Sequence, residues 1–292
     1  MPPKPVKKAI LPVAGMGTRF LPATKAQPKE MLPIYDTPAI QFIVQEAVEA
    51  GIEEIIIVTG RNKRAIEDHF DRNFELEFSL EAKGKHKELA LIRGITDMAH
   101  VSYVRQPEPK GDGHAILCAE RILPPDEPIV VLFGDDLVFN ENGPNAVQQL
   151  IQAYEETGDP VVLLEEIEPQ NTSKYGIVDF EAENGVRGRI KDFVEKPSPA
   201  DAPSNLGVVG KYLITPEIVK FLQSSSAGTD GEIRLANAFM DYLHAGKSLQ
   251  GRILTGTRYD TGDKIGFLKA TLHVARQRGG QEAEDAIREF IG

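Results

Sequence analysis

Short apolar runs alternate along the chain with stretches in which apolar residues recur every three or four positions. The runs KAILPVA, EEIIIVTG, VSYVRQ and PIVVLFGDD predict four strands, the first two of them buried. IQFIVQEAVEAG and HAILCAERIL, which lie between them, have helical spacing, and Gly51 is a helix-stop signal. Such alternation is typical of helices packed on a largely parallel sheet. The charged region 63–92 predicts a long helical excursion after the second strand.

The pattern changes in the second half of the chain. A helix around AVQQLIQAYEETG and a strand at VVLLEEI are followed by shorter runs, GIVDF, GRIKDFVEKP and GKYLIT. These predict antiparallel strands added to one side of the sheet. The last 30 residues are predicted to be helical, with a break at Gly279-Gly280. We expect one domain over 1–292, with a nucleotide-facing half at about 1–140 and a second half at about 141–292.

Composition excludes several classes of protein. The chain has 292 residues, 41% of them hydrophobic, which suffices for a large core. Its net charge of −11 argues against bulk binding to nucleic acid or anionic membranes. Cys118 is the only cysteine and lies in an apolar run, so we expect a core role and no disulfide or cysteine zinc site. No apolar run approaches the roughly 18 residues of a membrane helix, and MPPKPVKK does not resemble a signal peptide, which predicts a cytoplasmic protein.

One segment of this acidic chain is cationic. Residues 1–29 carry six basic side chains and no acid: Lys4, Lys7, Lys8, Arg19, Lys25 and Lys29. We interpret the first three as a solvated tail. The other three surround the glycine-rich stretch LPVAGMGTRF at 11–20.

This stretch fits neither of the two common phosphate-binding loops. It lacks the P-loop spacing, and Phe20 stands where the dinucleotide fingerprint needs its third glycine. Asp36 lies where a ribose-binding acid would be expected, but its YDTP context predicts a turn. Gly15 and Gly17 still let backbone N–H groups approach a phosphate, and Arg19 can bind phosphate oxygens in a bidentate manner.

Polar segments follow three of the predicted strands, and ligands of open parallel sheets bind beyond the carboxyl ends of the strands. The glycine loop follows the first strand, QPEPKGDGHA the third and Gly134-Asp135-Asp136 the fourth. Asp135 is a candidate Mg²⁺ ligand, with a helix N-cap or turn acid as the alternative. Asp260, after the strand-like RILTGTRY, would complete the metal site or only form a turn. Cations, carboxylates and glycines without a Ser-His-Asp set or thiolate indicate phosphoryl or nucleotidyl transfer.

The segment AGMGTRFLPATKAQPKEMLP resembles the signature of the sugar-nucleotide pyrophosphorylases. The later blocks VTGRNKRAIEDHFD, RQPEPKGDGHAILCA, KYGIVDF, FVEKP, DGEIRLANA and RYDTGDK resemble, in order, the bacterial UTP–glucose-1-phosphate uridylyltransferases of that family. The resemblance implies a Rossmann-like αβα sandwich with a mixed, mostly parallel central sheet. It also implies formation of UDP-glucose and pyrophosphate from UTP and glucose 1-phosphate with Mg²⁺, in a homodimer or homotetramer whose contacts come from the second half.

The resemblance also implies roles for individual residues. Arg19 and Lys29 would stabilise the triphosphate and the departing pyrophosphate, and Asp135 would hold Mg²⁺, with Asp260 as a second ligand. Gln106 and Gly111 would contact the uracil edge, the amide donating and accepting at once. The residues expected against the nucleotide are Ala14, Gly15, Gly17 and Thr18.

At the sugar end, Glu195 would accept hydrogen bonds from glucose hydroxyls and Lys196 would neutralise the sugar phosphate. The alternative for this EKP pair is a solvated charge pair that ends a strand. The backbone at Gly176, and at Gly207 or Gly210, would approach the sugar. Lys211 stands where the family has arginine.

One departure from the family pattern concerns Gly134. Most uridylyltransferases have Pro-Asp-Asp or a similar sequence at this point, whereas Gly-Asp is common in the deoxythymidylyl and mannose-type relatives. A transferase for another base or sugar, such as dTTP, is therefore an alternative. A non-catalytic nucleotide-sugar sensor is another, although such a protein would be expected to have lost Arg19, Lys29, Asp135 or Lys196. A nicotinamide dehydrogenase is opposed by Phe20.

Overall fold

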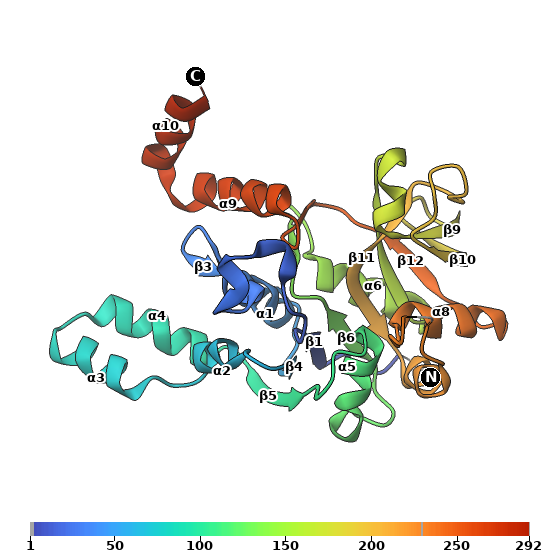
Figure 1. Cartoon of the computed structure of the whole chain (residues 1–292), viewed down its shortest axis with the longest axis horizontal. Coiled ribbons are helices and arrows are strands. Elements are labelled where there is room, and N and C mark those ends of the chain that lie inside the picture. The colour runs from blue at the N-terminus through green and yellow to red at the C-terminus, as the bar shows by residue number, and fades with distance from the viewer. Residues whose placement is uncertain (1–2, 229, 292) are drawn as a thin grey trace.

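The computed structural model describes residues 3–228 and 230–291, and a nine-stranded mixed sheet runs through this part of the chain (Figure 1). The strand order is β5-β4-β1-β6-β11-β8-β12-β10-β9. The sheet contains β1 (Lys8–Pro12), β4 (Glu54–Thr59), β5 (His100–Arg105), β6 (Ile129–Leu132), β8 (Val161–Glu166), β9 (Gly176–Ala182), β10 (Arg187–Glu195), β11 (Leu206–Ile214) and β12 (Gln250–Ile253).

The first half of this sheet is parallel. Strands β5, β4, β1 and β6 all run in one direction, as the buried apolar runs predicted. Side chains of β1 alternate between the two faces, with Ile10 in one apolar core and Ala9 and Leu11 in the other. Both faces are therefore covered, which is the usual condition of parallel strands.

The second half is largely antiparallel, as the shorter runs after residue 176 predicted. Strand β11 pairs with β8 and, at Gly207 and Ile177, also with β9. The strands β11, β8, β12, β10 and β9 therefore close into a small barrel. Five of the nine strand pairings recorded for the described residues are antiparallel, so the prediction of a mostly parallel sheet holds only for the first half. Tight returns such as the β9–β10 turn replace the crossover helices that parallel strands need.

Two small sheets and ten helices complete the described fold. The small sheets pair β2 (Pro33–Ile34) with β3 (Thr37–Pro38), and β7 (Asp136–Phe139) with β13 (Thr257–Asp260). The helices are α1 (Ala39–Glu49), α2 (Arg64–Phe70), α3 (Phe74–Ala82), α4 (His86–Thr96), α5 (Asp112–Cys118), α6 (Ala146–Thr157), α7 (Pro216–Ser224), α8 (Leu235–His244), α9 (Lys264–Arg278) and α10 (Gly280–Ile291). RILTGTRY, predicted as one strand, forms β12 and β13, because Gly256 turns the chain between them at φ +119°.

Helix ends follow local sequence signals. Asn145 and Gln148 form a capping box at the start of α6, and Gly158 ends that helix in the left-handed conformation. The predicted break at Gly279-Gly280 separates α9 from α10.

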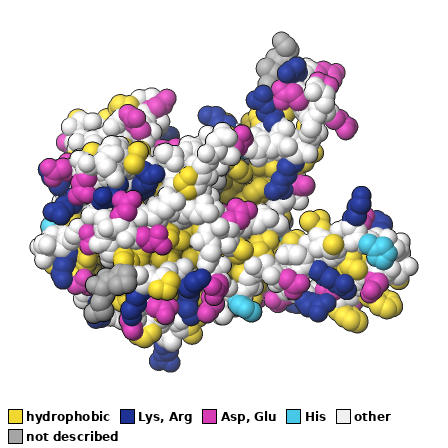
Figure 2. Space-filling view, turned by 180° about the vertical axis from the view of Figure 1, so that it is seen from behind, with side chains coloured by type: hydrophobic (Ala, Val, Ile, Leu, Met, Phe, Trp, Pro, Cys, Tyr) yellow, Lys and Arg dark blue, Asp and Glu magenta, His cyan; other side chains and the backbone are white. Residues whose placement is uncertain are grey.

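Two arms project from the body. Figures 1 and 2 show the α3–α4 hairpin, which is the charged excursion, and the C-terminal helix α10. Phe74 and Phe78 on α3 stack on each other but stay 76% and 65% exposed. In the described part of the chain, no helix has the length and apolarity to cross a lipid bilayer.

A charged pair lies inside the core between the two halves. Lys211 on β11 is fully buried, and its ammonium lies 2.5 Å from a carboxylate oxygen of Glu46 on α1. The other Glu46 oxygen accepts the backbone N–H of Ala146, at the start of α6. The lysine that replaces the family's arginine therefore joins β11 to two helices.

We expect Lys211→Ala to lower the free energy of unfolding by about 3–5 kcal/mol, because it leaves the Glu46 carboxylate buried without its cation. Chemical denaturation measures this. The control is the double variant Lys211→Met/Glu46→Gln, which removes both charges and should lose less. A single variant within 1 kcal/mol of the parent, roughly the scale of a surface pair, would contradict this assignment.

Candidate active site

The glycine loop leaves β1 at the carboxyl edge of the sheet, and its two glycines have different surroundings. A Cβ on Gly15 would meet no atom within 4 Å. Gly17 has φ +65°, and a Cβ there would lie 3.1 Å from Cβ of Lys29. The Thr24 hydroxyl also donates to the Gly17 carbonyl at 2.7 Å. Gly15 therefore opens the site, whereas Gly17 allows the lysine segment to pack against the loop.

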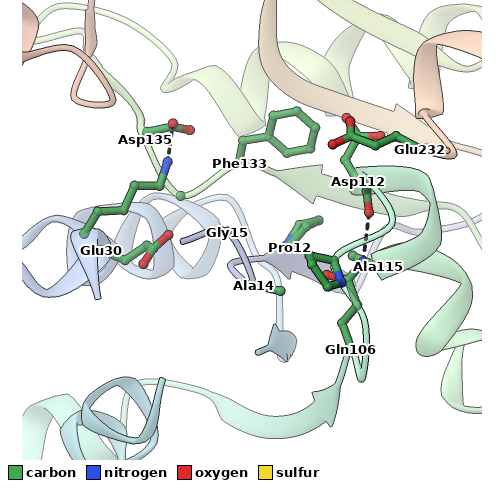
Figure 3. A pocket seen from close by; sticks show the side chains of 14 residues that line it. Pro12, Ala14, Gly15, Glu30, Gln106, Asp112, Ala115, Phe133, Asp135 and Glu232 are labelled. Carbon is green, nitrogen blue, oxygen red and sulfur yellow. Dashed lines mark hydrogen bonds and ion pairs between the residues drawn. The ribbon is translucent and has the colours of Figure 1, made fainter. Parts of the chain in front are cut away.

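A cavity of about 280 Å³ lies against this loop (Figure 3). Glu30 and Asp135 stand on one side of it, and Gln106, Asp112 and Ala115 on the other. Its wall is formed by Pro12, Ala14, Gly15, Lys29, Glu30, Gln106, Pro109, Gly111, Asp112, Ala115, Phe133, Gly134, Asp135 and Glu232. The three segments that follow β1, β5 and β6 therefore converge, as predicted from their positions after strands.

The strongest charge contact in this cavity joins Lys29 to Asp135, with Nζ 2.5 Å from Oδ2. Burial alone would lower the pKa of Lys29, but Asp135 and Glu30 hold it above its ordinary value. Burial alone would raise the pKa of Asp135, but Lys29 and, further away, Arg258 and Arg19 hold it below its usual range. Both groups are therefore charged near neutral pH, and they form a dipole at the cavity wall.

A second ion pair, formed by Glu30 and Lys63, is buried next to Lys29. Glu30 is 1% exposed, and one of its carboxylate oxygens accepts from Lys63 Nζ at 2.7 Å. A Cβ on Gly134 would lie 2.9 Å from Cγ of Glu30 and 3.1 Å from Cγ1 of Val13. The glycine at 134 therefore makes room for the Glu30 side chain.

Gln106 is held at the far end of the cavity and is 6% exposed. Its Nε2 lies 2.9 Å from the Gly111 carbonyl oxygen, to which it donates, and 3.0 Å from His114 Nδ1. The amide nitrogen is thus engaged within the protein. The expectation that this amide donates and accepts at once toward a base is not met in this arrangement.

A second cavity, of about 320 Å³, adjoins the first and lies at the mouth of the barrel. Asp112, Phe133, Asp135 and Glu232 line both cavities. Of the predicted residues, the second cavity is lined by Arg19, Asp135, Gly176, Glu195, Lys196, Gly210 and Asp260. The structure thus brings the predicted sugar end next to Asp135.

Glu195 and Lys196 form an ion pair at the end of β10, with 3.0 Å between Lys196 Nζ and Glu195 Oε1. Lys196 has φ +50°, a backbone conformation that is unfavourable for lysine, and its N–H donates to the Tyr175 carbonyl at 3.0 Å. Non-glycine residues in this conformation cluster at functional sites. The left-handed turn distinguishes this pair from an ordinary strand end.

Gly210 lines the second cavity, but both polar groups of its backbone are already engaged within the protein. Its N–H donates to Asp136 at 2.9 Å, and its carbonyl accepts from the Phe133 N–H at 2.8 Å. A Cβ at this position would lie 2.2 Å from an Asp136 oxygen, which explains the glycine. The expected sugar contact through the Gly210 backbone is therefore not supported by the structure.

The two predicted metal ligands face each other across a turn. A Cβ on Gly262 would lie 2.6 Å from Asp135 Oδ2 and 3.0 Å from Asp260 Oδ1, so both carboxylates border the same small space. Burial, with repulsion from Asp136 and Asp135, raises the pKa of Asp260. Across residues 3–228 and 230–291, no three acidic, histidine or cysteine side chains gather as a metal site. Two carboxylates suit Mg²⁺, which usually takes its remaining ligands from phosphate and water.

Three predicted residues line neither cavity. Gly17 and Thr18 lie at the start of the 3₁₀ turn Thr18–Phe20, and Gly207 lies in β11, where it pairs with Glu165 and Ile177. Asp36, for which the YDTP context predicted a turn, lies in the β2–β3 turn and pairs with Arg278 at 3.1 Å.

Comparisons with known proteins agree with this geometry. The nucleotidyl transferase family matches residues 8–277. The chain belongs to this family. A UTP–glucose-1-phosphate uridylyltransferase of Staphylococcus epidermidis is 50% identical over 288 residues, 99% of this chain and 98% of the relative.

Solved structures of nucleotidyl transferases are also similar. A UTP-bound UGPase from Acinetobacter baumannii has a TM-score of 0.88 at 40% identity and covers 98% of this chain and 99% of its own. A UDP-glucose pyrophosphorylase complexed with UDP-glucose has a TM-score of 0.84 at 40% identity, with 94% of this chain and all of the other covered.

Sequence reasoning missed several charged residues of this nucleotidyl transferase site. Arg258 is buried between Asp136 and Glu165, with 3.0 Å from its Nη1 to the Glu165 carboxylate. Asp112 lines both cavities and accepts the Leu235 N–H at 2.8 Å, and burial raises its pKa. Glu30 lies within the family signature, but its ion pair with Lys63 is visible only in the structure.

The two glycines Gly134 and Gly15 form a matched pair for mutagenesis. We expect Gly134→Ala to lower the free energy of unfolding by about 1–3 kcal/mol, since its methyl overlaps Glu30. Gly15→Ala should change it by less than about 0.5 kcal/mol, because its methyl points into open space, but should weaken nucleotide binding. Thermal unfolding and calorimetric titration with UTP measure the two effects. Equal destabilisation by both would refute this distinction.

Proposed function

We propose that this chain transfers a uridylyl group from UTP to glucose 1-phosphate, forming UDP-glucose and releasing pyrophosphate. The observation that carries the proposal is the meeting of a nucleotide cavity and a sugar cavity at Asp135. Relatives at about half identity carry the name of this activity, and similar structures hold UTP or UDP-glucose. A Rossmann-like αβα sandwich suits the parallel half, because helices cover both of its faces.

The nucleotide end would bind a triphosphate through cationic side chains and through exposed backbone groups. Ala14 and Gly15 line the cavity without large side chains, so phosphates can approach the main chain there. Lys29 stands at its wall, and Arg19 lines the adjoining cavity. These two cations would neutralise the triphosphate and the charge that develops on the leaving pyrophosphate.

Mg²⁺ fits the pair Asp135 and Asp260. When bound there, it would withdraw charge from the phosphate oxygens and help to align them. Asp135 and Asp260 would supply two ligands to the ion, and Lys29, which pairs with Asp135 in the absence of substrate, would be free to pair with a phosphate oxygen.

The sugar end positions the nucleophile. Glu195 would accept hydrogen bonds from sugar hydroxyls, and Lys196 would reduce repulsion between the sugar phosphate and the triphosphate. An oxygen of the sugar phosphate attacks the α-phosphorus in line, and the bond to the pyrophosphate oxygen breaks with its electron pair leaving on pyrophosphate. The homodimer or homotetramer and the cytoplasmic location stay predictions.

The decisive assay is pyrophosphate release with Mg²⁺ and glucose 1-phosphate, with UTP or dTTP as the nucleotide. We expect release that requires the sugar phosphate and favours UTP. Asp135→Asn should lower kcat by about 10²–10³, because it removes a charge that the transition state needs. Circular dichroism of the variant controls for folding. A near-normal rate would show that the metal lies elsewhere, and no release with any sugar phosphate would favour a sensor.

Lys196→Ala should affect the sugar substrate selectively. We expect the KM for glucose 1-phosphate to rise about 10- to 100-fold, as for loss of a charged hydrogen bond. The Kd for UTP should stay within about twofold, since Lys196 does not line the nucleotide cavity. Titration calorimetry and initial rates separate the two quantities. Equal weakening of both substrates would refute the assignment to the sugar end.

A further inference from the structure

The side chain of Gln106 has its hydrogen-bond donors fully occupied within the protein. The carbonyl oxygen of Gly111 can only accept, so the Gln106 atom that faces it at 2.9 Å must be the amide nitrogen. The same nitrogen lies 3.0 Å from His114 Nδ1. An amide nitrogen carries two hydrogens, and these two contacts use both.

The oxygen of the same amide is left for a ligand. Gln106 Oε1 has no hydrogen-bond partner among the described residues, although the residue is 6% exposed. It is also absent from the atoms that are both buried and unpaired in that part of the chain, namely Arg252 Nη1 and His273 Nε2. The oxygen is therefore open to the cavity that Gln106 lines.

His114 fits this arrangement in only one protonation state. Its Nδ1 must present a lone pair to the Gln106 N–H, which places the proton of the neutral ring on Nε2. Cys118 Sγ, one helical turn further along α5, lies 3.8 Å from Nε2 and 3.9 Å from Nδ1, so the tautomer is set by Gln106 and not by the sulfur. The His114 ring therefore joins α5 to the Gln106 amide.

We propose that His114 is a positioning residue that, together with the Gly111 carbonyl, fixes the polarity of Gln106 and so selects the base. The free Oε1 accepts a hydrogen bond from an N–H, which uracil and thymine present at N3. Cytosine presents a lone pair at N3, which would face the Gln106 oxygen. This inference rests on the proposed function only in placing a nucleotide base at this end of the cavity.

Without His114, one Gln106 N–H loses its partner, and only the Gly111 carbonyl then opposes a turn of the amide that would present an N–H to the base. His114→Leu removes the acceptor with little change in volume. His114→Asn keeps an acceptor at the position of Nδ1 and is the matched control. His114→Phe, which keeps a ring without nitrogen, replaces the leucine variant if that variant does not fold.

The test is titration calorimetry of UTP and CTP with Mg²⁺ and no sugar phosphate, so that no turnover occurs. The parent protein should bind UTP at least roughly 100-fold more tightly than CTP, since the wrong base would leave buried polar groups unpaired. His114→Leu should lower this ratio about tenfold or more, the scale of one hydrogen bond, and His114→Asn should retain most of it. An unchanged ratio in His114→Leu, or an equal loss in both variants, would overturn the proposal.

The same measurements separate this inference from the proposed function. A parent protein that prefers UTP in binding but releases no pyrophosphate would fail the function and keep the inference. Turnover of UTP, together with an unchanged ratio of UTP to CTP affinity in His114→Leu and His114→Phe, would support the function and overturn the inference.

Discussion

The ion pair between Lys29 and Asp135 is the contact on which the site depends. Partial burial opposes the charged form of each group, and the partner's charge more than offsets it. Each is kept charged by the other, with Glu30 close by. On the proposed function, substrate binding would exchange the partners of the two groups, since Asp135 could hold the metal while Lys29 pairs with a phosphate, and neither charge would be left unpaired. The cavity is therefore organised before the substrate arrives, which is the condition for efficient electrostatic stabilisation.

The sheet places this pair where the two substrates must meet. The parallel half directs the glycine loop and the segments after β5 and β6 to one edge, and the barrel half brings the end of β10 and the middle of β11 to the same point. Asp135 lies between the end of β6 and the start of β7, on the boundary of both cavities. A change from parallel to antiparallel pairing thus has a functional consequence, because the returning strands bring the sugar end to the nucleotide end.

Much of this could be predicted from the sequence, and what could not depends on long-range contacts. Apolar runs identified the strands of the sheet, and their following loops identified Gly15, Lys29, Gln106 and Asp135 at one edge. Closure of the barrel could not be predicted, because strand patterns carry no information on which edges pair. Lys63 lies 33 residues from Glu30, and Arg258 lies 122 residues from Asp136. Such partners have no local spacing signal, and the contact of Gln106 with His114 appears only once the fold of the turn from β5 into α5 is known.

Gly134 shows how a residue that seems to indicate specificity can have another cause. In the sequence it suggested a base other than uracil, whereas in the structure its missing side chain leaves room for Glu30, the carboxylate that supports Lys29. Base polarity depends instead on Gln106, at the other side of the cavity. An acceptor at Gln106 cannot separate uracil from thymine, since both carry an N–H at N3. Discrimination between UTP and dTTP must therefore come from the ribose hydroxyl or the 5-methyl position.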